Sequence, residues 1–189
     1  IEELMLLANE LVAEWLGKKR CPAIYRVHDK PDEQKLARLG ACAETIGLDL
    51  AVEELLEPRG VSAFLARVQG HEKKQVLEML MLRSMKQAQY DIANIGHFGL
   101  ASSAYLHFTS PIRRYADLVV HRALFQASHG PTHSLKETAD HISDTERNSA
   151  DAERDSRDVK MYAFLKAQLQ MAKPPVYPAL VIDVRNFGF

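Results

Sequence analysis

Three side chains that could bind a ligand or take part in catalysis recur at intervals of four residues: Arg113, Asp117 and His121. On a helix this spacing places them on one face, with Arg114 beside them. An arginine can hold a phosphate through two parallel hydrogen bonds, and the N–H groups at the start of a helix also attract anions. These residues therefore predict a phosphate-binding site. On pattern alone, the stripe is more typical of an internal ladder of ion pairs, Arg113–Asp117–His121, that satisfies buried polar groups.

A helix is needed to bring these side chains together, and its start is signalled just before them. Thr109 or Ser110 can serve as the cap, and Pro111 suits the first helical position. Because Leu118 and Phe125 border the polar stripe, we expect a largely buried helix whose polar stripe faces a polar site. The expected apolar face consists of Ile112, Ala116, Val119 and Ala123.

A second candidate site lies on the final helix. Ser134 and Glu137 have the spacing of a capping box, which predicts a long helix reaching about residue 171. Glu146 and Glu153 continue the inward face of this helix, where an unpaired acid would cost free energy. We therefore expect either that they approach a polar site or that neighbouring arginines neutralise them. The inward face begins with Leu135, Ala139 and Ile142, and the candidate partners are Arg147, Arg154 and Arg157.

The first helix is expected over residues 2–15 and carries two further polar candidates. Glu2 and Asn9 sit side by side at the edge of its apolar stripe, whereas Glu3 lies on the solvated side. The stripe itself consists of Ile1, Leu4, Met5, Ala8, Leu11, Val12, Trp15 and Leu16.

The other segments complete a helix-rich α/β (α+β) unit over residues 1–174. Residues 175–189 are expected to begin a separate β unit, because two prolines precede a strand-like run. Further helices are expected at residues 31–46, at 48–59 (ended by Pro58 and Gly60), at 61–68 and at 72–86. Strands are expected at residues 22–28, 89–94, 97–102, 104–108 and 176–184.

Composition excludes several classes of protein. The chain of 189 residues has 24 basic and 25 acidic side chains, so any nucleic-acid site must concentrate positive charge locally. No apolar run is long enough to span a membrane, and the two cysteines have no disulfide or metal spacing, which favours a reducing, cytoplasmic location. No metal-binding histidine motif, glycine-rich phosphate loop or tight acidic cluster is present in the sequence. We expect no metal ligands and no membrane contact from this chain.

Residues 96–122 read GHFGLASSAYLHFTSPIRRYADLVVHR. This segment resembles the signature of the ribonuclease II/ribonuclease R catalytic domain, which has a GHFGLA run, a tyrosine, HFTSPIRRY, and then DL and HR. Shorter stretches, IEELMLLAN, YRVHDKPDEQKL and ERNSADAERD, resemble other parts of that domain in the same order. The chain is therefore identified as the C-terminal part of this domain, the RNB domain, and VYPALVIDVRNFGF resembles the first strand of the S1-type OB-fold that follows it.

The resemblance implies roles for individual residues. Arg113 matches the arginine that contacts the phosphate at the scissile end of the RNA, and Glu153 matches a glutamate near the RNA end, so we expect both to be catalytic. One of the paired glutamates before MLLAN borders the nucleotide channel in the family, and the helical wheel favours Glu2 over Glu3. The residues expected to bind RNA are Glu2, Asn9, His107, Thr109, Ser110, Arg114 and Tyr115.

The resemblance also implies a reaction. Members of the family hold Mg²⁺ with four aspartates that precede this part of the domain, and they hydrolyse single-stranded RNA processively from the 3′ end to nucleoside 5′-monophosphates. We expect the 189 residues to supply the phosphate clamp and part of the channel wall, and to be inactive alone. A dimer could cover the apolar surface that a missing half-domain would leave.

Two other classes of function remain open. The parent could be a non-catalytic RNA-binding protein with the same fold, which the presence or absence of the upstream aspartates would decide. A purely structural helical scaffold would require the ion-pair ladder, and exposure of the Arg113 guanidinium would count against it.

Overall fold

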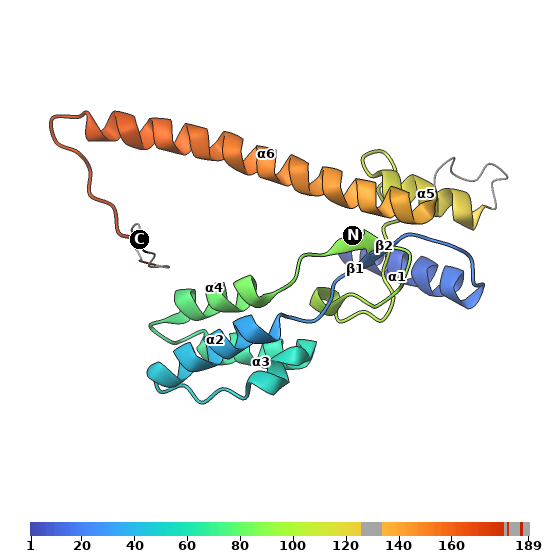
Figure 1. Cartoon of the computed structure of the whole chain (residues 1–189), viewed down its shortest axis with the longest axis horizontal. Coiled ribbons are helices and arrows are strands. Elements are labelled where there is room, and N and C mark those ends of the chain that lie inside the picture. Colours follow the sequence, from blue (N-terminus) through green and yellow to red (C-terminus); the bar gives the residue numbers. More distant parts are fainter. Residues whose placement is uncertain (126–133, 180, 182–185, 187–189) are drawn as a thin grey trace. The chain divides into compact units, whose positions relative to one another are not determined.

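Helices form most of the regular structure of the chain, as the sequence predicted (Figure 1). The computed structural model describes residues 1–125, 134–179, 181 and 186. These residues form two units, Ile1–Ser143 and Asp144–Phe189. No helix among them is long and apolar enough to cross a membrane.

Three helices of the first unit pack together with a short 3-10 helix (Figure 1). They are α2 (Glu33–Thr45), α3 (Pro58–Val68) and α4 (Lys74–Ser84), with η1 (Val52–Leu56) between the first two. The Asp32 carboxylate caps α2 by accepting the Lys35 N–H at 3.0 Å. The shared core includes Leu36, Leu39, Phe64, Val68, Leu77 and, from η2 (Phe98–Leu100), Phe98.

A pair of short antiparallel strands forms the centre of the remaining part of this unit. Strand β1 (Tyr25–Val27) pairs with β2 (Gln89–Asp91) so that Arg26 faces Tyr90. Helix α1 (Glu2–Lys18) and helix α5 (Tyr115–Leu124) pack on β1 through a shared core. Members of that core are Ala13, Leu16, Tyr25, Val27, Leu106 and Val120.

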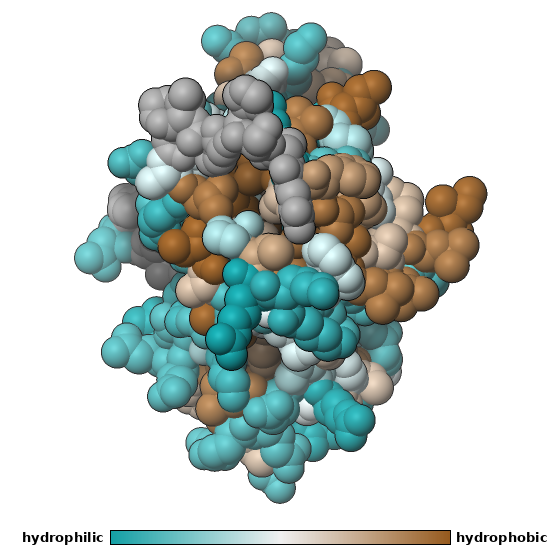
Figure 2. Space-filling view, turned by 90° about the vertical axis from the view of Figure 1, so that its right-hand side faces the viewer, coloured by the Kyte–Doolittle hydropathy of each residue, from teal (hydrophilic) through white to brown (hydrophobic). Residues whose placement is uncertain are grey.

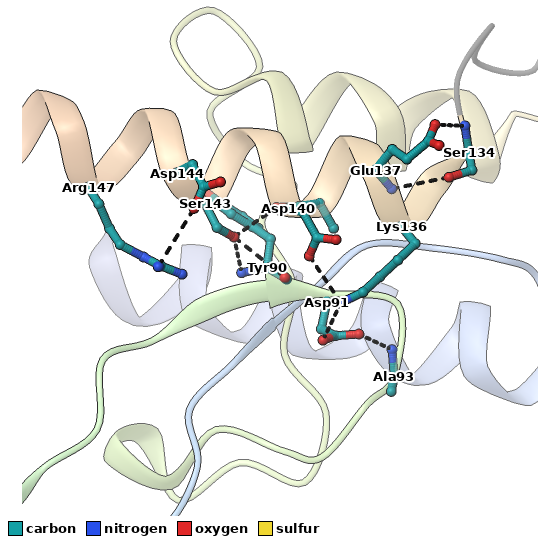
Figure 3. A network of polar contacts seen from close by, with 11 residues as sticks. Tyr90, Asp91, Ala93, Ser134, Lys136, Glu137, Asp140, Ser143, Asp144 and Arg147 are labelled. Atoms are coloured by element: carbon teal, nitrogen blue, oxygen red, sulfur yellow. Dashed lines mark hydrogen bonds and ion pairs between the residues drawn. The ribbon is translucent and has the colours of Figure 1, made fainter.

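Helix α6 (Leu135–Leu169) begins in the first unit and continues into the second. Its capping box is formed, because the Ser134 hydroxyl accepts the Glu137 N–H and the Glu137 carboxylate accepts the Ser134 N–H, both at 3.2 Å. The Tyr90 N–H donates to the Ser143 hydroxyl at 2.9 Å, which fixes the first turns of α6 to β2 (Figure 3). The expected inward face is confirmed for Leu135, Ala139 and Ile142. Its expected continuation through Glu146 and Glu153 was wrong, because both residues are exposed.

Several expectations about elements were wrong. Residues 98–100 form a 3-10 helix instead of a strand, and residues 104–108 are irregular. Pro58 starts α3 instead of ending a helix, because its fixed φ and missing N–H suit the first turn. Residues 174–179 form no strand, and the rest of the expected strand at 176–184 lies largely outside the described residues, so the OB-fold remains a prediction.

Helix α1 buries a face rotated from the expected one. Leu16 of the expected stripe is buried, together with Asn9 from its edge and with Ala13, whereas Leu11 and Trp15 of the stripe are exposed. The helix carries apolar residues on two opposite sides, and periodicity alone could not tell which side the core would take. Large apolar side chains left exposed on α1 are Leu4, Met5, Leu7, Leu11 and Trp15. Apolar surface also shows in brown among hydrophilic side chains on the face drawn in Figure 2.

Candidate nucleic-acid interface

The segment that carries Arg113 is a turn that precedes α5. The backbone N–H groups of Arg113 and Arg114 both point to the Ser110 carbonyl oxygen, at 3.3 and 3.2 Å. The helix begins only at Tyr115, with Arg114 as its N-cap. The expected cap at Thr109 or Ser110 was therefore wrong. Pro111 fits the second position of a turn as well as the first turn of a helix, so its presence could not decide between them.

We call residues 110–114 the 110–114 turn. Because these residues form a turn and not a helix, Arg113 and Arg114 have different surroundings. The Arg114 guanidinium donates two hydrogen bonds to Asp117, at 2.8 Å from Nε and 3.0 Å from Nη2. Arg113 is exposed and its side chain has no hydrogen bond or ion pair with any described residue. Ile112, expected on the apolar face, is 97% exposed.

The ion-pair ladder considered above is not formed. Asp117 pairs with Arg114 instead of Arg113, and the His121 Nε2 lies 2.9 Å from the carbonyl oxygen of Phe108. His121 therefore supports the chain just before the turn. The exposure of Arg113 counts against a purely structural stripe and leaves its guanidinium available to an anion.

Asn9 supports the same segment from α1. Its side-chain amide donates to the Tyr105 hydroxyl at 2.9 Å, and its carbonyl oxygen accepts the Phe108 N–H at 3.0 Å. Arg26 of β1 donates its backbone N–H to the Tyr105 carbonyl oxygen at 2.9 Å. The structure thus places Asn9 in a buried positioning contact, where both ends of its amide are used.

His107 is a partly buried residue of this segment, and its imidazole is neutral near pH 7. Its Nδ1 lies 2.9 Å from the Tyr90 hydroxyl, and the Tyr90 ring lies under the Arg26 guanidinium at 4.6 Å. Burial lowers the pKa of His107 to about 3, and the positive charges of Arg114 and Arg26 lower it further. A neutral imidazole cannot attract phosphate by charge, so any contact of His107 with RNA must be a hydrogen bond or a ring contact.

The other expected residues are distributed unevenly. Tyr115 is 47% exposed at the start of α5, and the Thr109 hydroxyl is buried without a partner among the described residues. Glu2 is exposed in the first turn of α1. Glu153 belongs to the second unit, where its carboxylate accepts a hydrogen bond from Arg157 at 3.0 Å. The structure therefore brings His107, Thr109, Ser110 and both arginines into one continuous segment.

The sequence pattern singled out Asp117 and His121 by their spacing, but it did not predict that they hold the chain around Arg113 in place. It missed Tyr90 and Tyr105 altogether as residues of the site. The only local signal for the Arg114–Asp117 pair was their separation of three residues, which suits an ion pair on a helix as well.

Among the described residues, neither a metal-binding cluster nor a free ring nitrogen of His28 in a cavity wall is available. No group of three or more histidine, cysteine, aspartate or glutamate side chains among the described residues could hold a metal ion, so these residues do not fit Mg²⁺. A cavity of about 870 Å³ lies between the start of α3 and residues 94–103. Both ring nitrogens of His28 in its wall are already used, by the Lys86 carbonyl oxygen and the Gly99 N–H.

Replacing Asn9 by alanine is expected to lower the free energy of unfolding by about 2 kcal/mol, because the Phe108 N–H and the Tyr105 hydroxyl would lose their buried partner. Urea denaturation followed by circular dichroism measures the change. Asn148→Ala, at an exposed position of α6, is the matched control. An equal, small shift for both variants would contradict the positioning contact.

Stability is also expected to depend on pH. Burial lowers the pKa of His107 to about 3 and that of His97 to about 4, whereas both bind a proton below about pH 6.5 in the unfolded chain. The unfolded state therefore binds more protons as the pH falls from about 6.5 to 4, and the free energy of unfolding decreases by at most about 1.4 kcal/mol per pH unit for each histidine. Denaturation curves of the chain and of His107→Gln across this window test the idea. An unchanged slope in the variant would contradict it.

The chain matches one family model and many known proteins. Residues 1–130 match the model described as the RNB domain. Ribonuclease R 1 of Lactococcus lactis is 36% identical over 198 aligned residues, which cover all of this chain and 24% of the relative. Ribonuclease R of Escherichia coli is 37% identical over 205, covering all of this chain and 25% of the relative. The chain thus spans about a quarter of the length of these relatives.

Solved structures share the fold. Mycoplasma genitalium RNase R in complex with ribose-methylated single-stranded RNA matches with a TM-score of 0.79 and 29% identity, over 88% of this chain and 28% of that protein. Yeast Ssd1, described as a pseudonuclease, matches with a TM-score of 0.62 and 27% identity, over 75% of this chain and 18% of that protein.

Proposed function

Because the chain belongs to the RNB domain family, we propose that it is the C-terminal part of the catalytic domain of a 3′→5′ exoribonuclease that degrades single-stranded RNA to nucleoside 5′-monophosphates. One observation carries the proposal for this part of the molecule. Arg113 is exposed and unpartnered among the described residues, on a turn whose neighbouring arginine is already neutralised. This is the arrangement expected of a residue that meets a phosphate.

Arg113 would act on the scissile phosphate. Its planar guanidinium can donate two parallel hydrogen bonds to phosphate oxygens, which fixes their orientation as well as their position. Negative charge on these oxygens changes as the phosphodiester bond breaks, and a pre-placed donor stabilises the transition state without having to reorganise. The Ser110 hydroxyl and the exposed Tyr115, which flank Arg113 in the chain, would contact the same RNA end. The Thr109 hydroxyl is buried, so RNA would reach it only if the chain around it moved.

The metal ions that the family uses would be held elsewhere. The described residues offer no metal cluster, so we propose that the ligands are aspartates that precede residue 1 in the parent protein. When bound, these ions would activate water for attack on the phosphate. Glu153 and Glu2 are proposed to border the RNA end and the channel, respectively. We further propose a cytoplasmic location, for which the free thiols of Cys21 and Cys42 are suited.

The alternative of a non-catalytic RNA-binding parent is not favoured by the relatives, which are named ribonuclease R at 36–37% identity. The likeness to yeast Ssd1, described as a pseudonuclease, is compatible with a parent protein that keeps this fold and binds RNA without cleaving it. An exoribonuclease would carry the metal-binding aspartates before residue 1 and would release mononucleotides. A non-catalytic RNA-binding protein would lack these aspartates and release none.

The test uses the full-length parent protein with Mg²⁺ and single-stranded RNA labelled at its 3′ end. Release of labelled nucleoside 5′-monophosphate, abolished by EDTA, would support the exoribonuclease. RNA binding without release would favour the non-catalytic alternative. Release from an internal site or from the 5′ end would contradict both the direction and the mode of cleavage.

A further inference from the structure

We propose that Asp117 is a positioning residue that sets the direction in which Arg113 meets the RNA phosphate, and that Arg114 serves this arrangement instead of binding RNA. The inference rests on the proposed phosphate contact of Arg113. It assigns to the second arginine a role different from the RNA-binding role expected from the sequence.

The first argument is the way one carboxylate holds both ends of the 110–114 turn. Asp117 Oδ1 accepts the Ser110 N–H at 2.7 Å, at the beginning of the turn. The same oxygen accepts Arg114 Nη2 at 3.0 Å and Oδ2 accepts Arg114 Nε at 2.8 Å, at the end of the turn. Arg113 lies between these two attachment points, so the carboxylate limits the positions that its backbone can take.

The second argument is the rigidity of the element that carries this carboxylate. Asp117 is completely buried on α5, next to Ala116 and one turn before Val120, which are core residues. His121 on the same helix lies 2.9 Å from the Phe108 carbonyl oxygen and so joins the preceding segment to α5. The turn is therefore tied to a packed helix at several points, and its tip is not an independent loop.

The third argument concerns charge. A buried carboxylate is tolerated when a hydrogen-bonded cation pairs with it, and Arg114, whose side chain is only 18% exposed, provides that cation. Pairing leaves the positive charge of Arg114 largely neutralised, while the charge of Arg113 has no partner among the described residues. Two adjacent arginines thus differ in availability, and a phosphate would be attracted to Arg113.

A merely structural Asp117 would affect stability but not the use of Arg113, and a double-mutant cycle separates the two cases. The full-length parent protein is prepared as wild type, Asp117→Asn, Arg113→Ala and the double variant. Turnover of single-stranded RNA is then measured at a temperature at which all four are folded. Asp117→Asn is expected to lower kcat about 10²-fold with a smaller change in KM, because displacement of a catalytic group by about 1 Å has that effect.

In the Arg113→Ala background the same Asp117→Asn change is expected to lower kcat by less than about 3-fold, because there is no longer a guanidinium to misplace. Asp29→Asn is the matched control, since Asp29 also accepts a backbone N–H and pairs with a lysine, Lys86, but lies outside the 110–114 turn. It is expected to leave kcat unchanged. Should Asp117→Asn fail to fold, Arg114→Gln replaces it in the cycle, because Arg114 is partly exposed and lies outside the regular helix.

Equal effects of Asp117→Asn in the presence and absence of Arg113 would overturn the inference while leaving the proposed function intact. Full activity of Arg113→Ala would overturn both. If Arg114→Gln weakens RNA binding by the same factor with and without Arg113, Arg114 contacts the RNA directly and its assignment here is wrong.

Discussion

Replacing Arg113 by alanine in the full-length protein is expected to lower kcat on single-stranded RNA by about 10²- to 10³-fold, the usual cost of removing one preorganised donor from a developing charge. The side chain is exposed and has no partner among the described residues, so its removal should leave the fold intact. Single-turnover cleavage of 3′-labelled RNA measures the chemical step without the contribution of product release.

Two variants sharpen this prediction. Arg113→Lys keeps the positive charge but loses the paired hydrogen bonds, and we expect it to recover RNA binding better than kcat. Arg38→Ala removes another exposed arginine, on α2, and should leave cleavage of single-stranded RNA unchanged. A kcat for Arg113→Ala within a few-fold of wild type would exclude Arg113 from the phosphate contact.

The 189-residue chain alone is expected to release no mononucleotide from RNA, even with added Mg²⁺, whereas the full-length protein should be active and should lose its activity with EDTA. The physical reason is that the proposed active site is formed by two parts of the parent protein, only one of which lies in this chain. The chain supplies the guanidinium of Arg113, but its described residues include no cluster of ligands that could hold the metal.

A nuclease contaminant is the main risk in that experiment. The Arg113→Ala form of the 189-residue chain, purified in the same way, is therefore the control. EDTA-sensitive release by the chain that disappears in this variant would mean that the metal ligands are present within these 189 residues. That result would contradict our division of the site.

Several elements defined by local signals were predicted well. Helix α1 was predicted at residues 2–15 and found at Glu2–Lys18, and the capping box of Ser134 and Glu137 begins α6 as expected. Elements that depend on partners far away in sequence were predicted poorly. Of the three strands expected over residues 89–108, only Gln89–Asp91 is found, because only this segment pairs with another strand, Tyr25–Val27.

In the candidate site too, some features were predictable from the sequence and others were not. The sequence by itself singled out the residues that we propose carry the chemistry, namely the arginine pair, Asp117 and His121, and the motif around them predicted the family. It could not determine which arginine is free. Both Arg113 and Arg114 lie within reach of Asp117 on an ideal helix, at four and three residues, so periodicity allows either pairing.

The tertiary structure decided between the two arginines. Because the buried Asp117 carboxylate also accepts the Ser110 N–H, the chain before Tyr115 forms a turn and Arg114 becomes the partner. In the same way, α1 has apolar residues on two sides, and only the packing of Asn9, Ala13 and Leu16 shows which side is buried. Local patterns indicate which interactions a residue can make, whereas the burial and the hydrogen bonds of the folded chain determine which of them it makes.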